Sequence, residues 1–171
     1  ISSMVDEIDE YVDHVNALRE KTLPADAVAF MKECEDRNDY SNPKYQEYVQ
    51  IMNEQYVDRK QPSKLYHLKD LGGHAVYNVF QGDNEFVITG KLKDWHFRDQ
   101  LKNIKVPTLL TFGEHETMPL ETAKTMDSLI PNSKLVTTPN GGHHHMVDNP
   151  DVYYKHLADF IRSVEDGTFN K

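Results

Sequence analysis

The chain has 171 residues, of which 38% are hydrophobic and 27% charged, and its formal net charge is −9. This length suffices for one domain with a buried core, and the negative charge disfavours nucleic acid as a partner because its phosphates would be repelled. The one cysteine excludes an internal disulfide, and no apolar run or leading signal pattern suits a membrane, so we expect a cytoplasmic protein without a membrane partner.

The stretch from Ser3 to Tyr56 predicts three amphipathic helices. Ser3 and Asp6 are expected to cap the first helix, Pro24 to start the second, and Pro43 to lie in the first turn of the third. The opposite face of the first helix is acidic, which predicts a solvated surface or, as the alternative, a region that steers a cationic substrate. The apolar stripe of the first helix consists of Met4, Ile8, Tyr11, Val12, Val15 and Leu18.

The middle of the chain has a weaker pattern. Breaks at Pro62 and Gly72 leave short helical pieces, of which residues 75–80 are the best candidate. Residues 86–89 are β-branched and apolar and predict a short strand that ends at Gly90. Taken together, residues 1–104 are expected to form a helical cap domain.

The stretch from residue 106 to residue 148 has the order strand, acidic loop, helix, strand, histidine loop. Thr108–Phe112 and Lys134–Thr138 predict buried strands, and Pro119 starts the helix between them. Glu116 and His143 each follow one of these strands, where open α/β sheets keep their chemistry. With a last helix from Pro150, residues 105–171 predict the α/β class and a sheet that is incomplete by itself.

This pattern resembles the last third of an α/β-hydrolase, in which the catalytic residues follow the chain order serine, acid, histidine. Residues 84–90, Asn-Glu-Phe-Val-Ile-Thr-Gly, and 93–95, Lys-Asp-Trp, resemble the junction of cap and core in the proline iminopeptidase group. The resemblance extends over the whole chain and includes Ser2 and Ser3. It implies a helical cap domain followed by the C-terminal part of an α/β-hydrolase core.

The residues that would carry the nucleophile are missing from the sequence. It contains neither Gly-x-Ser-x-Gly nor a His-Gly-Gly loop, both of which precede the cap in the family. The resemblance therefore implies that the N-terminal half of the same enzyme is a partner of this chain. We expect residues 1–171 alone to be inactive.

His143 and Glu116 are the catalytic candidates. His143 directly follows Gly141-Gly142, as the family's histidine follows a small residue, whereas His144 and His145 lie beyond that position. A metal site and an inert polar loop are the alternatives for the three histidines, although no Cys or His-Glu-x-x-His spacing supports zinc. The rival acid is Glu114, which strand alternation would point to the same side.

Glu85 is the candidate for substrate binding. In the iminopeptidase group, cap acids hold the free amino terminus of the substrate, and a buried ammonium needs such a partner. The alternative is a purely structural carboxylate at the junction. Glu47 and Glu54 share a face of the third helix and could supply a second carboxylate, or both could face solvent.

The resemblance implies a serine aminopeptidase-type hydrolase that releases an N-terminal residue, often proline, from a peptide or an amino-acid amide. The mechanism requires no cofactor and no metal. Two alternatives stay open at this point. One is another capped hydrolase, such as an esterase or an epoxide hydrolase, and the other is a non-catalytic binding fragment.

Overall fold

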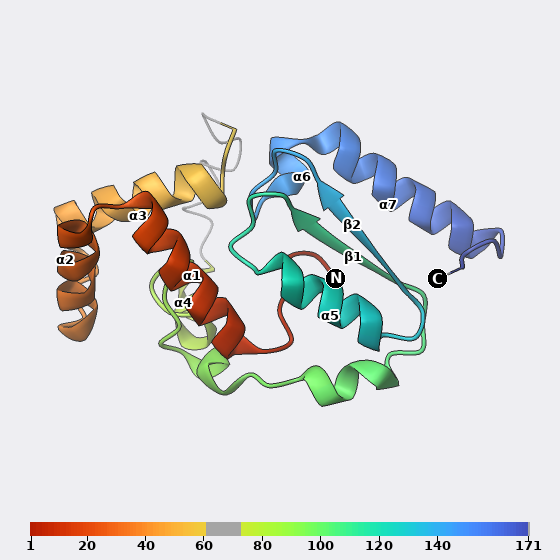
Figure 1. The fold of residues 1–171 in the computed structure, drawn as a ribbon, viewed down its shortest axis with the longest axis horizontal. Helices are drawn as coiled ribbons and strands as arrows, with labels where there is room; N and C mark the ends of the chain where they lie inside the picture. Colours follow the sequence, from red (N-terminus) through yellow and green to blue (C-terminus); the bar gives the residue numbers. More distant parts are fainter. Residues whose placement is uncertain (61–72, 171) are drawn as a thin grey trace.

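A computed structural model describes residues 1–60 and 73–170 (Figure 1). The breaks predicted at Pro62 and Gly72 fall outside these residues. Over the described ranges, no helix has both the length and the apolar character needed to cross a membrane. The elements are α1 Ile8–Thr22, α2 Ala25–Asp36, α3 Pro43–Tyr56, α4 His74–Phe80, the 3₁₀ helices η2 Lys91–Asp94 and η3 Arg98–Asn103, β1 Thr108–Gly113, α5 Leu120–Leu129, β2 Ser133–Thr138, α6 His145–Asp148 and α7 Pro150–Glu165.

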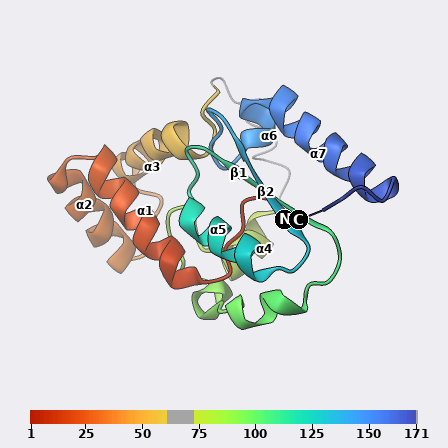
Figure 2. The same ribbon diagram turned by 45° about the vertical axis from the view of Figure 1, so that its right-hand side comes forward.

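Helices α1, α2 and α3 pack together on one side of the molecule, and the strands with α5, α6 and α7 lie on the other (Figures 1 and 2). The predicted second and third helices are confirmed, since α2 and α3 begin at Ala25 and Pro43. Both bury one apolar stripe, as their 3.6-residue spacing predicts. The buried residues of these two helices are Ala27, Val28, Met31, Cys34, Tyr45, Val49, Met52 and Tyr56.

The predicted capping of the first helix by Ser3 and Asp6 is wrong. Helix α1 begins only at Ile8, and its N-cap residue makes no side-chain cap bond. Ser3 is held elsewhere because its backbone N–H donates to the Thr111 carbonyl at 2.9 Å. Asp6 is buried and accepts the Arg98 guanidinium at 2.7 Å, so its carboxylate serves an ion pair instead of a helix terminus.

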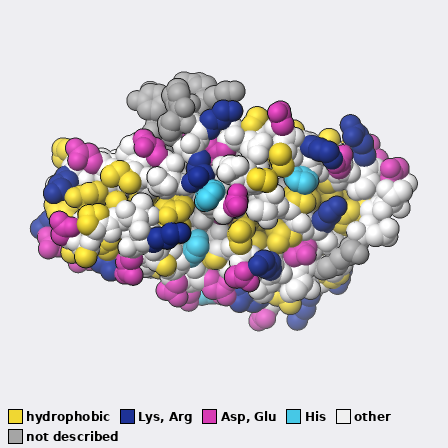
Figure 3. Space-filling model, turned by 45° about the horizontal axis from the view of Figure 1, so that its top comes forward, with side chains coloured by type: hydrophobic (Ala, Val, Ile, Leu, Met, Phe, Trp, Pro, Cys, Tyr) yellow, Lys and Arg dark blue, Asp and Glu magenta, His cyan; other side chains and the backbone are white. Residues whose placement is uncertain are grey.

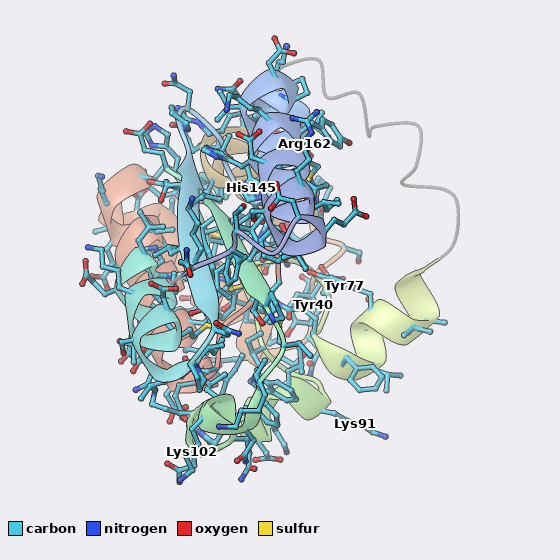
Figure 4. The ribbon with its side chains drawn as sticks, turned by 90° about the vertical axis from the view of Figure 1, so that its right-hand side faces the viewer. Tyr40, Tyr77, Lys91, Lys102, His145 and Arg162 are labelled. Carbon is cyan, nitrogen blue, oxygen red and sulfur yellow. The ribbon has the colours of Figure 1, made fainter. Side chains whose placement is uncertain are left out.

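The two predicted strands of the second half are confirmed as a parallel pair. Their register places Gly113 of β1 opposite Thr138 of β2, so both strands end at the same edge. Every residue of β1 is buried, and α5 and α7 cover opposite sides of the pair (Figure 4). Residues 1–3 run parallel to β1 along its other edge, with a bridge between Ser2 and Thr111.

The strand predicted at residues 86–89 is wrong, because Phe86 lies in a turn and residues 87–89 have no regular secondary structure. Its backbone groups find partners other than a neighbouring strand. The buried Arg19 guanidinium donates to the Phe86 carbonyl at 2.7 Å, and the Thr89 N–H donates to the Gln81 carbonyl at 2.9 Å. These two backbone groups are therefore hydrogen-bonded without a sheet.

The loops that follow β1 and β2 approach each other closely at Gly113. A Cβ atom on Gly113 would lie 2.2 Å from the Gly142 carbonyl oxygen, a backbone atom that cannot turn away. The Glu114 N–H donates to the Thr138 carbonyl at 3.0 Å and ties the two loops together. The glycine is required here for close approach.

We predict that Gly113→Ala lowers the free energy of unfolding by about 1–3 kcal/mol, because the new methyl group must push the two loops apart. Urea denaturation of the protein measures this change. Gly73→Ala is the control, since a Cβ atom there would meet nothing within 4 Å, and it should change stability by less than about 0.5 kcal/mol. Equal effects of the two substitutions would contradict this interpretation of Gly113.

Candidate active site

Glu116 and His143 meet at the edge where β1 and β2 end. The His143 Nδ1 atom lies 2.8 Å from Glu116 Oε1. The parallel register brings the two loops to one edge, and the close contact at Gly113 brings them near enough for this bond. An imidazole held in this way by a carboxylate keeps its Nε2 atom directed away from the acid.

The Glu116 carboxylate is almost fully buried and well supplied with donors. The Ser3 hydroxyl donates to Oε2 at 2.5 Å, the Thr117 N–H donates to Oε1 at 3.0 Å, and the Gly113 N–H donates to Oε2 at 3.3 Å. Burial alone would raise the pKa of Glu116. The hydrogen bond and charge of His143 and the donors Ser3 and Gly113 outweigh it and lower the pKa to about 2.

Ser3 is a site residue that the sequence pattern did not reveal in this role. Its backbone adopts a φ of 45°, which is unusual for a residue with a side chain, and this turn directs its hydroxyl to Glu116. Thr117 is a second such residue, because its hydroxyl donates at 3.1 Å to Glu116. Ser3 lies 113 positions before Glu116, so no local spacing could have paired them.

His143 is held by its backbone as well as by Glu116. Its N–H donates to the Tyr56 carbonyl at the end of α3 at 2.7 Å, and its side chain is 20% exposed. Histidine side chains reach the surface near the middle of the face in Figure 3. Burial works to lower the pKa of His143, but the charge of Glu85, the hydrogen bond and charge of Glu116 and the charge of Asp58 raise it to about 9.

The other two histidines have different partners. The His144 Nδ1 atom lies 2.8 Å from Asp58 Oδ1. His145, labelled beside α7 in Figure 4, is fully buried, with Nε2 at 3.1 Å from the Ser2 hydroxyl. The three rings thus do not converge on one point, and within residues 1–60 and 73–170 no three His, Cys, Asp or Glu side chains are grouped as metal ligands.

The structure brings Glu116 to His143, and the rival Glu114 points elsewhere. The Glu114 side chain is 53% exposed, and its Oε2 atom accepts the Asn140 N–H at 2.9 Å. Two residues of separation within a turn therefore suffice to give the carboxylates different surroundings.

Glu85 lies beside this pair. Its Oε1 atom is 3.8 Å from His143 Nε2, and its side chain is 13% exposed. The Tyr11 hydroxyl donates to the backbone carbonyl of Glu85, and the Tyr77 hydroxyl donates to its carboxylate at 3.1 Å (Tyr77 is labelled in Figure 4). The Thr117 hydroxyl lies 3.1 Å from Glu85 Oε1 and shares its one proton between Glu85 and Glu116. Burial and the Glu85 charge raise the pKa of both tyrosines, so these hydroxyls stay protonated donors.

Glu47 and Glu54 are not brought to this cluster. Both are exposed on α3, and Glu54 accepts a hydrogen bond from Gln50 at 2.7 Å. Their predicted part in substrate binding stays a prediction.

Comparison with known proteins identifies the family of this arrangement. No family model matches the chain. The proline iminopeptidase of Thermoplasma volcanium is 36% identical over 126 residues, 72% of this chain and 43% of the relative, and that of Saccharolobus solfataricus is 30% identical over 96% of this chain and 54% of the relative. In sequence this chain is similar to proline iminopeptidases, and its fold is that of an α/β-hydrolase.

The structure of proline iminopeptidase from Mycobacterium smegmatis has the same fold. It superposes with a TM-score of 0.81 at 23% identity, over 95% of this chain and 56% of that chain. The predicted fold class is confirmed. The proline iminopeptidase-like chain spans about half the length of the curated relatives it matches.

For the hydrolase proposed below, in which this chain is joined to the N-terminal half, we predict that His143→Ala lowers kcat by on the order of 10³-fold or more, with substrate binding less affected. His144→Ala and His145→Ala should act mainly on stability, because His144 pairs with Asp58 and His145 fills a buried position. Steady-state kinetics and urea denaturation of the three variants separate these effects. If His144→Ala or His145→Ala abolishes turnover of a stably folded protein while His143→Ala does not, the assignment is wrong.

Proposed function

We propose that this chain supplies the cap, the acid and the histidine of a serine hydrolase that releases the N-terminal residue, often proline, from peptides or amino-acid amides. The observation that carries the proposal is the buried contact of 2.8 Å between Glu116 and His143 at the carboxyl ends of two parallel strands. The proline iminopeptidases among its relatives support the same reaction class.

In this reaction a serine from the N-terminal half attacks the first carbonyl of the substrate. His143 takes the serine proton on Nε2 and then gives it to the leaving amine. Glu116 holds the proton on Nδ1, fixes the tautomer and stabilises the imidazolium without itself becoming protonated. The depressed pKa of Glu116 supports this role, because the carboxylate stays ionised at every pH at which the enzyme would work.

The partner of the chain in this proposal is the N-terminal half of the same enzyme. Two surfaces support it. None of the residues of α7 is buried although its spacing is strongly amphipathic, and Tyr154 and Ile161 are 56% and 45% exposed. A mainly apolar hollow of about 400 Å³ lies beside residues 1–3 and α7, lined in part by Ile1, Leu109 and Phe160.

Glu85 binds the substrate's free amino group in this proposal. Its carboxylate lies 3.8 Å from the catalytic imidazole, which suits an amine attached to the carbon next to the reacting carbonyl. The Tyr77 hydroxyl, together with the Thr117 hydroxyl that Glu85 shares with Glu116, holds the carboxylate in place. A cap carboxylate so placed selects peptides with a free amino terminus, because a blocked amine brings no charge to a partly desolvated anion.

We predict that Glu85→Gln in the full-length protein lowers kcat/KM for proline p-nitroanilide by roughly 30-fold to several-thousand-fold, equivalent to the ~2–5 kcal/mol typical of losing a desolvated charge partner. Hydrolysis of p-nitrophenyl acetate, which has no amine, should fall far less. Each value is taken on the plateau of its own pH profile, so that protonation of His143 does not enter.

The control is Glu114→Gln, which removes a carboxylate from the same region but from an exposed position. It should leave the ratio of the two activities unchanged. If Glu85→Gln lowers kcat/KM equally for both substrates, Glu85 only stabilises the junction of cap and core. The proposal would then be reduced to a capped hydrolase without specificity for a free amine.

A further inference from the structure

His143 lies between two carboxylates that come from different parts of the fold. Glu116, on the loop after β1, contacts Nδ1 at 2.8 Å, and Glu85, on the turn after α4, faces Nε2 at 3.8 Å. The Thr117 hydroxyl is 3.1 Å from an oxygen of each carboxylate and so links them. The second carboxylate lies on the side of the ring that a general base must keep free.

The surroundings of His143 favour its protonated form. Glu85, Glu116 and Asp58 face it with negative charge, from the turn after α4, the loop after β1 and the segment after α3. Positive charge on His144, whose ring centroid is 5.4 Å away, or on His145 would act in the opposite sense. Burial of the ring lowers the pKa of His143, but the three carboxylates outweigh burial and raise it to about 9. The imidazolium form is therefore favoured at pH 7.

An imidazolium cannot accept the proton of a serine. Every hydrolase of this kind needs Glu116 to orient the ring. A hydrolase that accepted all acyl compounds would not need Glu85. Its charge at Nε2 works against the base as long as nothing else neutralises it. An ammonium bound to Glu85 would provide that neutralisation.

We propose that Glu85 is a substrate-operated switch for His143: without an amine it holds the histidine as an imidazolium, and the substrate's ammonium, by pairing with Glu85, releases the ring as the general base. The inference rests on the proposed function, since it takes Glu85 as the site of the amine. It adds a role in setting the state of the base to the role in binding.

The step balances in charge and protons. The substrate brings one positive charge to Glu85, and the Nε2–H bond of His143 breaks, with the proton passing to solvent water and the electron pair remaining on Nε2. That lone pair then accepts the serine proton. A substrate without an amine leaves the imidazolium in place, so its rate depends on the small fraction of free base.

Specificity for a free amino terminus then has two sources. A blocked peptide binds more weakly because it leaves Glu85 unpaired, and it also meets an enzyme whose base is mostly protonated at neutral pH. The second source affects kcat as well as KM, whereas simple charge pairing in the ground state affects KM.

The test is the pH dependence of p-nitrophenyl acetate hydrolysis by the full-length protein and its Glu85→Gln variant. For the wild type, kcat/KM should rise with pH to a midpoint near the His143 value of about 9. In Glu85→Gln the midpoint should fall by about one unit or more, so that at pH 7 the variant hydrolyses this ester about tenfold faster than the wild type. A residue with only a structural role would not yield a gain when substituted.

Glu114→Gln is the charge-matched control and should leave the midpoint of the ester profile in place, because its carboxylate does not face His143. A second measurement does not depend on any variant. In the wild type, the midpoint of kcat for proline p-nitroanilide, which reports the bound state, should lie below the midpoint of kcat/KM for the ester, which reports the free enzyme.

The outcomes separate the inference from the proposed function. An unmoved ester midpoint in Glu85→Gln, or equal midpoints for the two wild-type profiles, would overturn the switch even if the anilide lost its preference. If the ester midpoint falls while anilide and ester lose activity equally on their plateaus, Glu85 controls the protonation of His143 but does not bind the amine, and both the amine site and its operation of the switch are overturned. A downward shift of the midpoint together with a selective loss of the anilide supports both.

Discussion

The hydrogen bond between Glu116 and His143 is the contact on which the rest of the site depends. It joins two loops that have no local connection and that meet only because β1 and β2 are parallel and end together. The close approach at Gly113 allows it sterically. The bond is buried, so the Glu116 carboxylate has lost its contacts with water. The charge-assisted bond to His143 compensates for this loss only together with further hydrogen-bond donors to the carboxylate, among them the Ser3 hydroxyl.

The helical half of the chain contributes to this site directly. The carbonyl of Tyr56, at the end of α3, accepts the His143 N–H, and Val57 accepts the N–H of His144 in the same way. Glu85 reaches the imidazole from the turn after α4 and is linked to the acid loop through Thr117. The catalytic pair and the carboxylate for the amine are therefore held by one connected set of hydrogen bonds. An ammonium bound to Glu85 would therefore change the electrostatic surroundings of His143.

Much of the fold could be predicted from the sequence because its signals are local. The β-branched run that stops at Gly113 and the proline that starts α3 act within a few residues, and both elements form where expected. The order of strand, acid, strand and histidine placed Glu116 and His143 at one sheet edge. Local patterns could not decide between Glu116 and Glu114, because that choice depends on the turn that follows β1.

The predictions that were wrong are those in which a distant partner overrides a local preference. Ser3 has the side chain of a helix cap, but pairing with β1 and the carboxylate of Glu116 hold it in a different backbone conformation. Residues 86–89 have the composition of a strand, but the buried Arg19 guanidinium donates to the Phe86 carbonyl, and within residues 1–60 and 73–170 no strand pairs with them. Both segments lie next to the site, which is where local sequence preferences are expected to be overridden.

The central claim is that a buried, ionised Glu116 holds the Nδ1 proton of His143. Proton NMR of the full-length protein tests it directly, because an imidazole N–H bound to a buried carboxylate resonates far downfield of an ordinary ring N–H. The expected spectrum has a downfield resonance from His143 that is present in the wild type and in Glu114→Gln, absent in His143→Ala, and returned to the ordinary range in Glu116→Gln. A resonance from His144, whose Nδ1 atom lies 2.8 Å from Asp58, is distinguished by its persistence in His143→Ala. If the resonance that is lost in His143→Ala persists in Glu116→Gln, or disappears in Glu114→Gln, the claim is contradicted.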